Sequence, residues 1–474
     1  MKPLHRLLAL VVSLLLASCG GGGGVLGLAG SEGGGVGTGG TGIVAGTVTG
    51  LGSVIVEDTR FDESRAALES RPDLVNSRAL SPTELRIGQY AHVEFEAAGI
   101  AARVRIASQF VGAALDINIA TGRFSVWGQP VAINVDPARG PVTVFSGYRT
   151  LADLRAGDPV QVYGVLQAGD GGGDLVRATL VEKLPAVGAL PARLTGTLQQ
   201  GSGGALLLAG RPLDLSGTAN APALALAAGT AVTAVVPWTA SLPARWQAFA
   251  VALLAPAPAP SLQVSGAVRL LQGGRAVVQG VEIDLATLPQ GDRDAVREGS
   301  YLTVHGRSRG GDGRRADADR VESQPQGGRS AQVRGSITSV AGTASFVVRG
   351  QAVDASAAAF EGGSAASLAV GSYVEVQGTQ TASGIVASRV TLPTATPDRA
   401  VLELTGTVQS LDAASRSARL QPREGQSVDL LLPAGSALPA VGDRIRATGY
   451  WDGSRLLVRE FEERSDNSGP GGGR

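Results

Sequence analysis

Apolar and polar residues alternate along short stretches of this chain, a pattern typical of half-buried β-strands. The alternation is clearest at 333–337, where valine, glycine and isoleucine are separated by arginine and serine. Residues 345–348 and 351–354 flank the turn dipeptide Arg349-Gly350, which predicts a β-hairpin. We therefore expect this part of the chain to fold from short strands joined by tight turns.

Two further strands complete the unit. Residues 371–378 and 385–392 are strand-like, and the Ala- and Ser-rich residues 357–368 predict a short helical turn before them. Five strands with a helical turn between the third and the fourth is the order of an OB-type barrel. A β-sandwich needs more strands than a unit of this length comfortably supplies.

Two glycines repeat this plan along the chain, with a period of about 70 residues. The first follows a Leu-containing turn and precedes a strand-like run, at Gly88, Gly157, Gly229, Gly299, Gly371 and Gly442. The second opens each unit, at Gly46, Gly112, Gly196, Gly266, Gly335 and Gly406. Self-similarity on this scale predicts one small unit used six times.

We therefore predict an all-β chain: a tandem array of about six small five-stranded OB-like barrels, with a short helical turn in some units. The predicted repeats are 43–109, 110–184, 192–254 (degenerate), 262–323, 331–392 and 401–463. The Ala-Pro run at 255–260 predicts a stiff spacer between the third and fourth repeats. A flexible Gly-rich tether at 19–42 and a disordered tail at 464–474 are expected on either side of the array.

Residues 1–18 predict a lipoprotein signal peptide. Lys2 and Arg6 give it a basic start, and the apolar run 7–16 is too short to span a bilayer as a helix. The Leu-Ala-Ser-Cys sequence that ends at Cys19 resembles the lipobox of bacterial lipoproteins, which implies cleavage before Cys19 and acylation of that residue. An ordinary secretory signal with a chance cysteine is the alternative. Because Gly20 follows the cysteine, the resemblance favours the outer membrane within the cell envelope.

Composition narrows the classes of function. The chain has 41 basic and 41 acidic residues, so it lacks the basic excess that nucleic-acid binding usually needs. Cys19 is the single cysteine, so neither disulfides nor thiol chemistry is expected in the body. Lys183 is the only lysine after the leader, which argues against a phosphate-binding loop or a Schiff-base lysine. We expect no cofactor and no nucleic-acid partner.

Candidate chemical residues are few and scattered. His92 and His305 lie in different repeats, without the clustered spacing of a zinc site. Aspartates in Gly-rich turns leave calcium binding as an alternative to plain solvated turns, at Asp170, Asp174, Asp312, Asp317 and Asp319. The sequence therefore predicts no catalytic residue and no metal site, and it leaves the ligand-binding residues unknown.

Aromatic and basic side chains carry weaker suggestions. Trp127 and Phe124 in repeat 2, and Tyr373 and Phe346 in repeat 5, are possible stacking residues, but we favour core packing for them. Tyr301 is the aromatic residue of repeat 4. Arginines near the fifth strands are interpreted as either exposed contacts or solubilising groups: Arg103, Arg177, Arg389 and Arg459.

Two segments resemble bacterial lipoproteins built from DUF5666 domains, a domain of unknown function. One is 50–56 followed by Arg60-Phe61-Asp62, and the other is 151–160 with Gly164 after it. The resemblance covers the leader and most of 46–462, and it is weakest in repeat 3. It implies the architecture and the location of the protein and supplies no catalytic residue.

These observations predict a non-enzymatic, lipid-anchored cell-envelope protein that binds or spaces an envelope protein or glycan. Its membrane contact is expected through acylated Cys19. Two alternatives stay open. A hydrolase of an envelope polymer would need two or more acidic residues in one cleft. Binding of single-stranded nucleic acid by the barrels would show a steep loss of affinity with salt.

Overall fold

The computed structural model describes residues 41–463, except 64, 98, 219–223, 240, 326–327, 370–371, 394–400, 423–426 and 452–454. The predicted signal peptide, Cys19, nearly all of the Gly-rich tether and the predicted tail lie outside the described residues. Within the described part, no helix is both long enough and apolar enough to cross a membrane.

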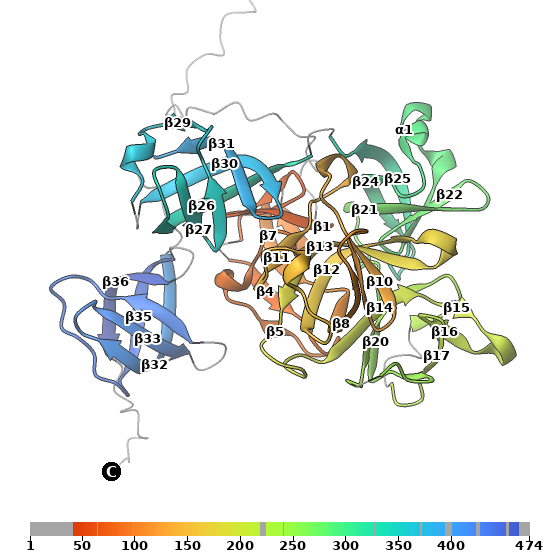
Figure 1. The fold of residues 1–474 in the computed structure, drawn as a ribbon, viewed down its shortest axis with the longest axis horizontal. Coiled ribbons are helices and arrows are strands. Elements are labelled where there is room, and N and C mark those ends of the chain that lie inside the picture. The colour runs from red at the N-terminus through yellow and green to blue at the C-terminus, as the bar shows by residue number, and fades with distance from the viewer. Residues whose placement is uncertain are drawn as a thin grey trace, which may run out of the picture. The chain divides into compact units, whose positions relative to one another are not determined.

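Strands and turns make up the described chain, which confirms the predicted all-β class (Figure 1). Among the described residues the one α-helix is α1 (Gln290–Ala295), which spans six residues. The 3-10 turns are η1 (Pro82–Glu84), η2 (Pro137–Arg139), η3 (Leu151–Asp153), η4 (Asp170–Gly172), η5 (Ser202–Gly204), η7 (Leu285–Thr287) and η8 (Ala365–Ser367). Of these, η3 and η8 lie between the third and fourth long strands of repeats 2 and 5, where a helical turn is predicted.

Residues 110–183 form a closed five-stranded barrel. Its strands are β8 (Phe110–Asn118), β9 (Arg123–Val126), β10 (Gln129–Ile133), β12 (Pro159–Ala168) and β13 (Asp174–Lys183). Pairing runs β8–β9–β10–β13–β12 and back to β8. The short strand β11 (Val144–Ser146) pairs in parallel with β13. Closure pairs both edges of every barrel strand, which removes the exposed edges of an open sheet.

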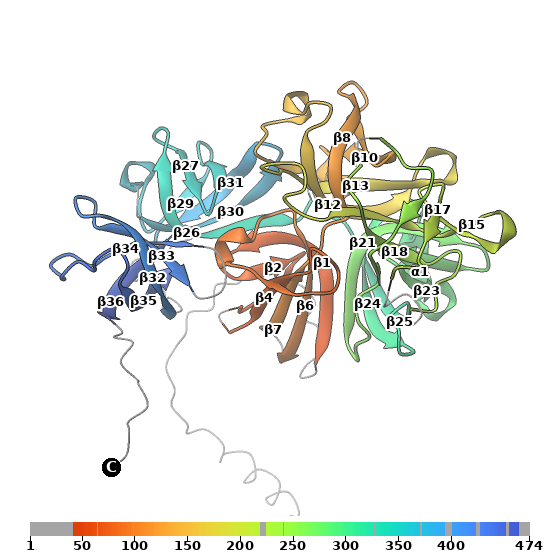
Figure 2. The ribbon, with the colours of Figure 1, turned by 90° about the horizontal axis from the view of Figure 1, so that it is seen from below.

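The C-terminal strands form a second closed barrel. They are β32 (Val401–Asp412), β33 (Ser417–Pro422), β34 (Val428–Leu431), β35 (Arg444–Trp451) and β36 (Leu456–Glu463). The ring order is β32-β33-β34-β36-β35, which is again first, second, third, fifth and fourth. Figures 1 and 2 both show these strands, in blue, side by side.

Repeats 1 and 3 have more, shorter strands. Those of repeat 1 are β1 (Gly42–Leu51), β2 (Val54–Val56), β3 (Thr59–Phe61), β4 (Ala67–Ser70), β5 (Arg78–Ala79), β6 (Tyr90–Ala97) and β7 (Ile100–Ile106). Those of repeat 3 are β14 (Ala192–Thr197), β15 (Gln199–Gln200), β16 (Leu206–Leu208), β17 (Arg211–Asp214), β18 (Ala231–Val236), β19 (Trp246–Gln247) and β20 (Ala250–Leu253). In repeat 1, β1 pairs with β2 and β6, β2 with β3, and β6 with β7. In repeat 3, β14–β18–β20 and β15–β16–β17–β19 are two separate ladders.

Repeats 4 and 5 share one pairing scheme. Repeat 4 has β21 (Leu262–Leu271), β22 (Arg275–Val278), β23 (Val281–Asp284), β24 (Tyr301–Arg309) and β25 (Arg315–Ser323). Repeat 5 has β26 (Ser330–Val340), β27 (Ser345–Val348), β28 (Gln351–Asp354), β29 (Ala359–Glu361), β30 (Tyr373–Thr381) and β31 (Gly384–Thr391). In repeat 4, β21 pairs with β22 and β24, and β25 joins β23 to β24. In repeat 5, β26 pairs with β27 and β30, and β31 joins β28 to β30.

Strand pairing also crosses between the predicted repeats. Strand β1 pairs in parallel with β21 over three residues and with β26 over two. Arg193 in β14 pairs with Val111 in β8. The backbone therefore joins the first repeat to the fourth and fifth, and the second to the third.

The first periodic glycine lies in a turn, and its backbone N–H donates a hydrogen bond near the end of the first strand. Positive φ angles favour glycine, because a side chain would clash with the backbone there. The angles are +91° at Gly88, +93° at Gly157, +87° at Gly229, +74° at Gly299 and +101° at Gly442. The N–H of each donates to the first strand: to the carbonyls of Val48, Ala114, Leu198, Val268 and Val408 respectively. Gly371 lies outside the described residues.

The second periodic glycine makes room for a side chain. In repeats 1, 2, 4 and 5 the residue that follows the second strand has a positive φ and reaches over the first strand; these residues are Glu57, Trp127, Gln279 and Arg349. An added Cβ would lie 2.9 Å from Glu57 Cγ at Gly46, 2.3 Å from Trp127 Nε1 at Gly112, 2.7 Å from Gln279 Cγ at Gly266 and 3.3 Å from Arg349 Cγ at Gly335. In these four repeats the glycine leaves room for that side chain. A Cβ at Gly196 would instead meet Asp174 and Leu208, and one at Gly406 would meet the Gln421 backbone.

Candidate ligand-binding pocket

The aspartates considered as calcium ligands mostly pair with arginines. The closest N···O pairs are Asp170–Arg123 at 2.8 Å, Asp174–Arg269 at 2.5 Å, Asp312–Arg314 at 2.7 Å and Asp317–Arg309 at 3.7 Å. Asp319 is exposed. Among the described residues no three His, Cys, Asp or Glu side chains are grouped to hold a metal ion. The structure therefore places Asp170 and Asp312 in turns, as expected, whereas Asp174 lies in strand β13 and Asp317 and Asp319 lie in β25.

The candidate stacking residues lie mostly in the interior. Trp127 is 5% exposed, and its ring packs edge-on against Trp238 and Trp246 at centroid distances of 5.6 and 6.1 Å. Its Nε1 donates to the carbonyl of Val111 at 2.8 Å. Phe124 and Phe346 are each 1% exposed, and Tyr373 is half-buried. Packing, rather than ligand stacking, accounts for the three fully buried rings.

The two histidines are placed apart, in β6 and β24. His92 lies against the ring of Tyr90, with centroids 5.8 Å apart. Burial, and to a lesser degree the charge of Arg105, lower the pKa of His92 to about 4. His305 Nε2 lies 3.4 Å from a carboxylate oxygen of Glu322. At neutral pH His92 is therefore an uncharged strand residue.

The arginines near the fifth strands differ from one another. Arg103 pairs with Glu94 at 2.7 Å, Arg389 pairs with Glu361 at 3.2 Å, and Arg459 donates to the Tyr450 hydroxyl at 3.0 Å. The interpretation as an exposed or solubilising residue is wrong for Arg177, which is 6% exposed. Its guanidinium donates to the backbone carbonyls of Arg139 and, at 3.3 Å, Gly299. Burial lowers the pKa of Arg177 to about 10.

A buried charged cluster joins repeat 1 to repeat 4 and the segment after it. The Glu57 side chain is fully buried, and its Oε1 accepts from the Tyr301 hydroxyl at 2.5 Å and the Thr47 N–H at 2.9 Å. Its Oε2 lies 3.1 Å from Arg329 Nε. Arg329 also pairs with Asp58 and donates to Thr303 Oγ1 at 3.1 Å. Burial, and then the charge of Glu57, raise the pKa of Tyr301 far above its usual value.

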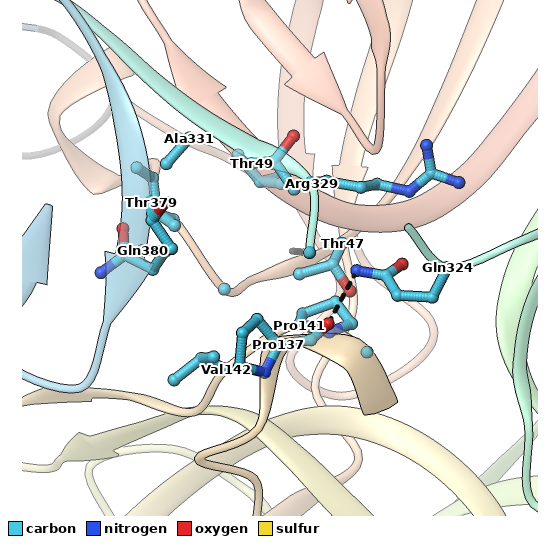
Figure 3. Close-up of a pocket in the computed structure, with 15 residues that line it drawn as sticks. Thr47, Thr49, Pro137, Pro141, Val142, Gln324, Arg329, Ala331, Thr379 and Gln380 are labelled. Carbon is cyan, nitrogen blue, oxygen red and sulfur yellow. Dashed lines mark hydrogen bonds between the residues drawn. The ribbon is translucent and has the colours of Figure 1, made fainter. Parts of the chain in front are cut away.

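Next to this cluster is a small cavity lined by Thr47, Gln324, Arg329 and Gln380 (Figure 3). Gln324 Nε2 donates to the carbonyl of Pro137 at 3.2 Å, the dashed bond in Figure 3. The Oε1 atoms of Gln324 and Gln380 are buried without a hydrogen-bond partner among the described residues. The cavity volume of about 30 Å³ has room for a water molecule or two, and not for a substrate.

A much larger polar pocket, which we call the β12–β13 pocket, lies where repeats 1, 2 and 3 meet. Its volume is about 480 Å³, within the range of small-molecule sites. Strands β12 and β13, side by side in Figure 2, supply part of its wall. Val160 and Val162 of β12 point into the barrel core, so the alternate residues Gln161 and Tyr163 face outward into the pocket.

Glu182 faces the same pocket because it pairs directly with Gln161 across the two strands. Its side chain is half-buried, and no described residue donates a hydrogen bond to its carboxylate. Burial is the main cause that raises the pKa of Glu182; the charge of Arg86 opposes the shift and that of Glu84 adds to it. A carboxylate that faces a pocket and has a raised pKa is a candidate binding group.

The other charged groups of the pocket wall have protein partners. Glu84 Oε1 accepts from Arg78 at 2.7 Å, and its Oε2 accepts from the Ser81 N–H at 2.9 Å. Arg193, 5% exposed, donates to the carbonyls of Ser108 at 3.1 Å and Pro72 at 2.9 Å. Lys183 is exposed, and its Nζ lies 5.3 Å from the centre of the Tyr148 ring. Of the two carboxylates of this wall, Glu182 is thus the one that no described residue binds.

Sequence reasoning missed Glu57 and Glu182, and it singled out Arg177 without foreseeing its burial. Each stands in an ordinary strand or turn pattern, and its partners come from distant parts of the chain. The sequence held a weak signal for Glu57. Repeats 2, 3, 4 and 5 carry tryptophan, alanine, glutamine and arginine at this hairpin position, so an acidic residue occurs there only in repeat 1 among these five. Lys183 was singled out only as the one lysine of the body, and the structure places it beside Glu182 on the pocket wall.

Comparison with known proteins finds a family match over part of the chain. The family described as "Domain of unknown function (DUF5666)" matches residues 334–391. This segment falls within β26 to β31, in the predicted fifth repeat, and not in the segments 50–62 and 151–164 that carry the resemblance noted from the sequence. No curated protein matches the chain. The chain therefore contains a DUF5666 domain at 334–391, a family whose description carries no activity.

Proposed function

We propose that this protein is a lipid-anchored cell-envelope protein whose body is a tandem array of six OB-like barrels, and that the array binds or spaces an envelope component without enzymatic activity. The recurrent strand order supports the array. Repeats 2, 4, 5 and 6 each pair their strands as first–second–third–fifth–fourth–first. In repeat 1 the bridge between Asp62 and Ile100 joins the end of β3 to β7, and in repeat 3 the ring is interrupted. The positive-φ glycine that binds the first strand recurs with the same spacing.

One observation carries the non-enzymatic role: buried polar side chains hold neighbouring repeats together. Glu57 of repeat 1 binds Tyr301 of repeat 4. Gln279 of repeat 4 accepts from the Leu166 N–H of repeat 2 at 2.8 Å. Groups with strongly perturbed pKa values mark active sites when they face a cleft, but here they are taken up by contacts within the protein. The chemistry of the interior therefore favours a rigid scaffold.

The hydrolase alternative requires two carboxylates in one cleft that are both free to react. The β12–β13 pocket contains two carboxylates, Glu84 and Glu182, as a glycoside hydrolase would require. Both oxygens of Glu84 are bound, by Arg78 and by the Ser81 N–H, so it is poorly placed to act as a base or nucleophile. This asymmetry supports a binding role for the pocket rather than hydrolysis.

Anchoring rests on the predicted lipobox at Cys19, which lies outside the described residues. Metabolic labelling with a fatty-acid analogue tests it, in cells that produce either the wild type or Cys19→Ala. We expect label in the wild type and its loss in the variant; equal labelling, or none in either, would refute the anchor. Protease treatment of intact and permeabilised cells then shows which side of the membrane the array occupies.

The non-enzymatic role is tested with the purified mature chain and isolated envelope polymer. We expect no release of soluble sugar above the level of a heat-treated sample. Release that disappears in Glu182→Gln, while this variant stays folded, would replace the proposal with the hydrolase alternative.

A further inference from the structure

The open carboxylate of Glu182 gives the β12–β13 pocket a chemical preference. We infer that this pocket binds a saccharide, with Glu182 accepting hydrogen bonds from sugar hydroxyls and with preference for a sugar that carries a carboxylate. The inference rests on the proposed function, since it names the ligand class that such an array would hold.

The Glu182 carboxylate is the hydrogen-bond acceptor that a ligand in this pocket would meet. The Glu182 carboxylate is half-buried and receives no hydrogen bond from any described residue. In contrast, both oxygens of Glu84 are bound, and both terminal nitrogens of Arg193 donate to backbone carbonyls. This carboxylate of Glu182 is therefore free to accept hydrogen bonds from a ligand that supplies donors, in place of water. A sugar presents adjacent hydroxyls, and a carboxylate can accept two of them at once.

The charge of the wall selects against a cation and for an anion. Four basic side chains, Arg78, Arg86, Lys183 and Arg193, stand against the two acidic ones, Glu84 and Glu182. A metal ion or an amine at Glu182 would add to this excess of positive charge. Hydroxyl groups satisfy Glu182 without adding charge, and a carboxylate on the same ligand would be attracted by the ammonium of Lys183.

The remaining wall fits a ring with polar edges and less polar faces. Leu80, Ile106 and Leu184 add apolar surface beside Gln161 and Tyr163. Gln161 Nε2 donates to Ser108 Oγ at 3.1 Å, so its amide orientation is fixed and its oxygen remains an acceptor. With a volume of about 480 Å³, the pocket is suited to a ligand with one or two sugar rings.

Repeat 4 offers a matched control. There Glu322 pairs with Thr303 across β24 and β25, in the register that Glu182 and Gln161 have in repeat 2. Glu322 differs in having partners, because Arg320 lies 2.9 Å and His305 3.4 Å from its carboxylate. Glu322→Gln therefore changes the same residue type at the same strand position without touching the pocket.

The experiment uses the acylated mature chain in detergent micelles, titrated by isothermal calorimetry with cellobiouronic acid, digalacturonic acid, the neutral disaccharide cellobiose and inorganic phosphate. We expect saturable binding of at least one acidic disaccharide, a loss of about tenfold or more in Glu182→Gln, and no change in Glu322→Gln. Lys183→Gln should weaken the acidic sugars and leave cellobiose unaffected.

Three results would overturn the inference. They are the absence of saturable binding by all three sugars, binding that Glu182→Gln leaves unchanged, and phosphate binding as tight as that of the acidic sugars. Circular dichroism shows whether each variant is folded, and Lys183→Gln gives an independent reading if Glu182→Gln is not. Because acylation of Cys19 is measured separately, a pocket that fails to bind sugar can be told apart from a failed anchor.

Discussion

Replacing Gly112 by alanine tests whether the second periodic glycine exists to receive the hairpin side chain. The new Cβ would lie 2.3 Å from Trp127 Nε1 and 2.7 Å from Trp127 Cε2, far inside contact distance. The indole cannot simply retreat, because Trp238 and Trp246 pack against it at 5.6 and 6.1 Å. Either the ring or strand β8 must move.

The expected loss of stability follows from three contributions. Overpacking a tight interior costs about 1–3 kcal/mol. Losing the hydrogen bond from Trp127 Nε1 to Val111, now 2.8 Å long, adds about 1 kcal/mol. Alanine restricts the unfolded chain more than glycine and returns about 0.4–1 kcal/mol. We therefore expect Gly112→Ala to lower the free energy of unfolding by about 2 kcal/mol.

Equilibrium unfolding in urea measures this loss, with tryptophan fluorescence as the signal because the reporting side chain is itself a tryptophan. Gly173→Ala is the control in the same repeat: its φ is −75°, and a Cβ there meets nothing within 4 Å. We expect that variant to unfold within about 0.5 kcal/mol of the wild type.

A double variant isolates the steric cause. With Trp127→Ala, the hairpin carries the same residue as Ala209 in repeat 3, and the space above Gly112 is vacated. Adding Gly112→Ala to that background should then cost at least about 1 kcal/mol less than in the wild type. If the two changes are additive, or if Gly112→Ala alone is as stable as Gly173→Ala, the explanation of the periodic glycine is refuted.

Three further predictions concern the charged groups. Arg329→Met should lower the free energy of unfolding by about 3–5 kcal/mol, because it leaves the buried Glu57 carboxylate without its counter-charge. Adding Glu57→Gln should recover part of this loss in urea unfolding. If the double variant recovers none of it, the pairing of Arg329 with Glu57 is contradicted. Tyr301→Phe removes one hydrogen bond to Glu57 and should cost about 1.5–3 kcal/mol in the same assay, whereas an unchanged midpoint would mean that the contact adds nothing. Glu182→Gln should stabilise the protein by about 1 kcal/mol at pH 7. Burial raises the pKa of Glu182 in the folded protein, so the stability that its protonated form contributes is present below the usual pKa of 4.5 and is lost as the pH rises through the folded value. Urea unfolding at pH 4 should therefore show no stabilisation by Glu182→Gln. Equal stabilisation at pH 4 and pH 7 would argue against burial of the charged carboxylate as the cause.

Much of the local structure could be predicted because its causes are local. The predicted strands 345–348 and 351–354 coincide with β27 and β28, since the Arg-Gly turn between them sets the hairpin. The end of a strand was harder to place. Strand β26 begins at Ser330, three residues before the predicted start, because Ser330 pairs with Thr379 of β30. That partner is a long-range one, invisible in the alternation of side chains.

The periodic glycines show the same division. Their spacing was plain in the sequence, and the positive φ of the turn glycines is a property of the residue itself. The reason for Gly112 became visible only when Trp127 was seen above it, because that contact joins two strands. A glycine in a strand can mark a close approach, but it does not say of what.

Alternation, turn residues and glycine spacing were thus sufficient to specify strands, turns and the all-β class, since each acts over a few residues of chain. The buried cluster and the β12–β13 pocket depended on the folded chain. Glu57 and Tyr301 are separated by 244 positions, and their hydrogen bond exists because repeats 1 and 4 meet. Glu182 looks like any strand-end glutamate; burial beside residues of repeats 1 and 3 is what leaves its carboxylate open to a ligand. Side-chain patterns encode local conformation, whereas the desolvation and pairing of charges are decided by which distant segments come together.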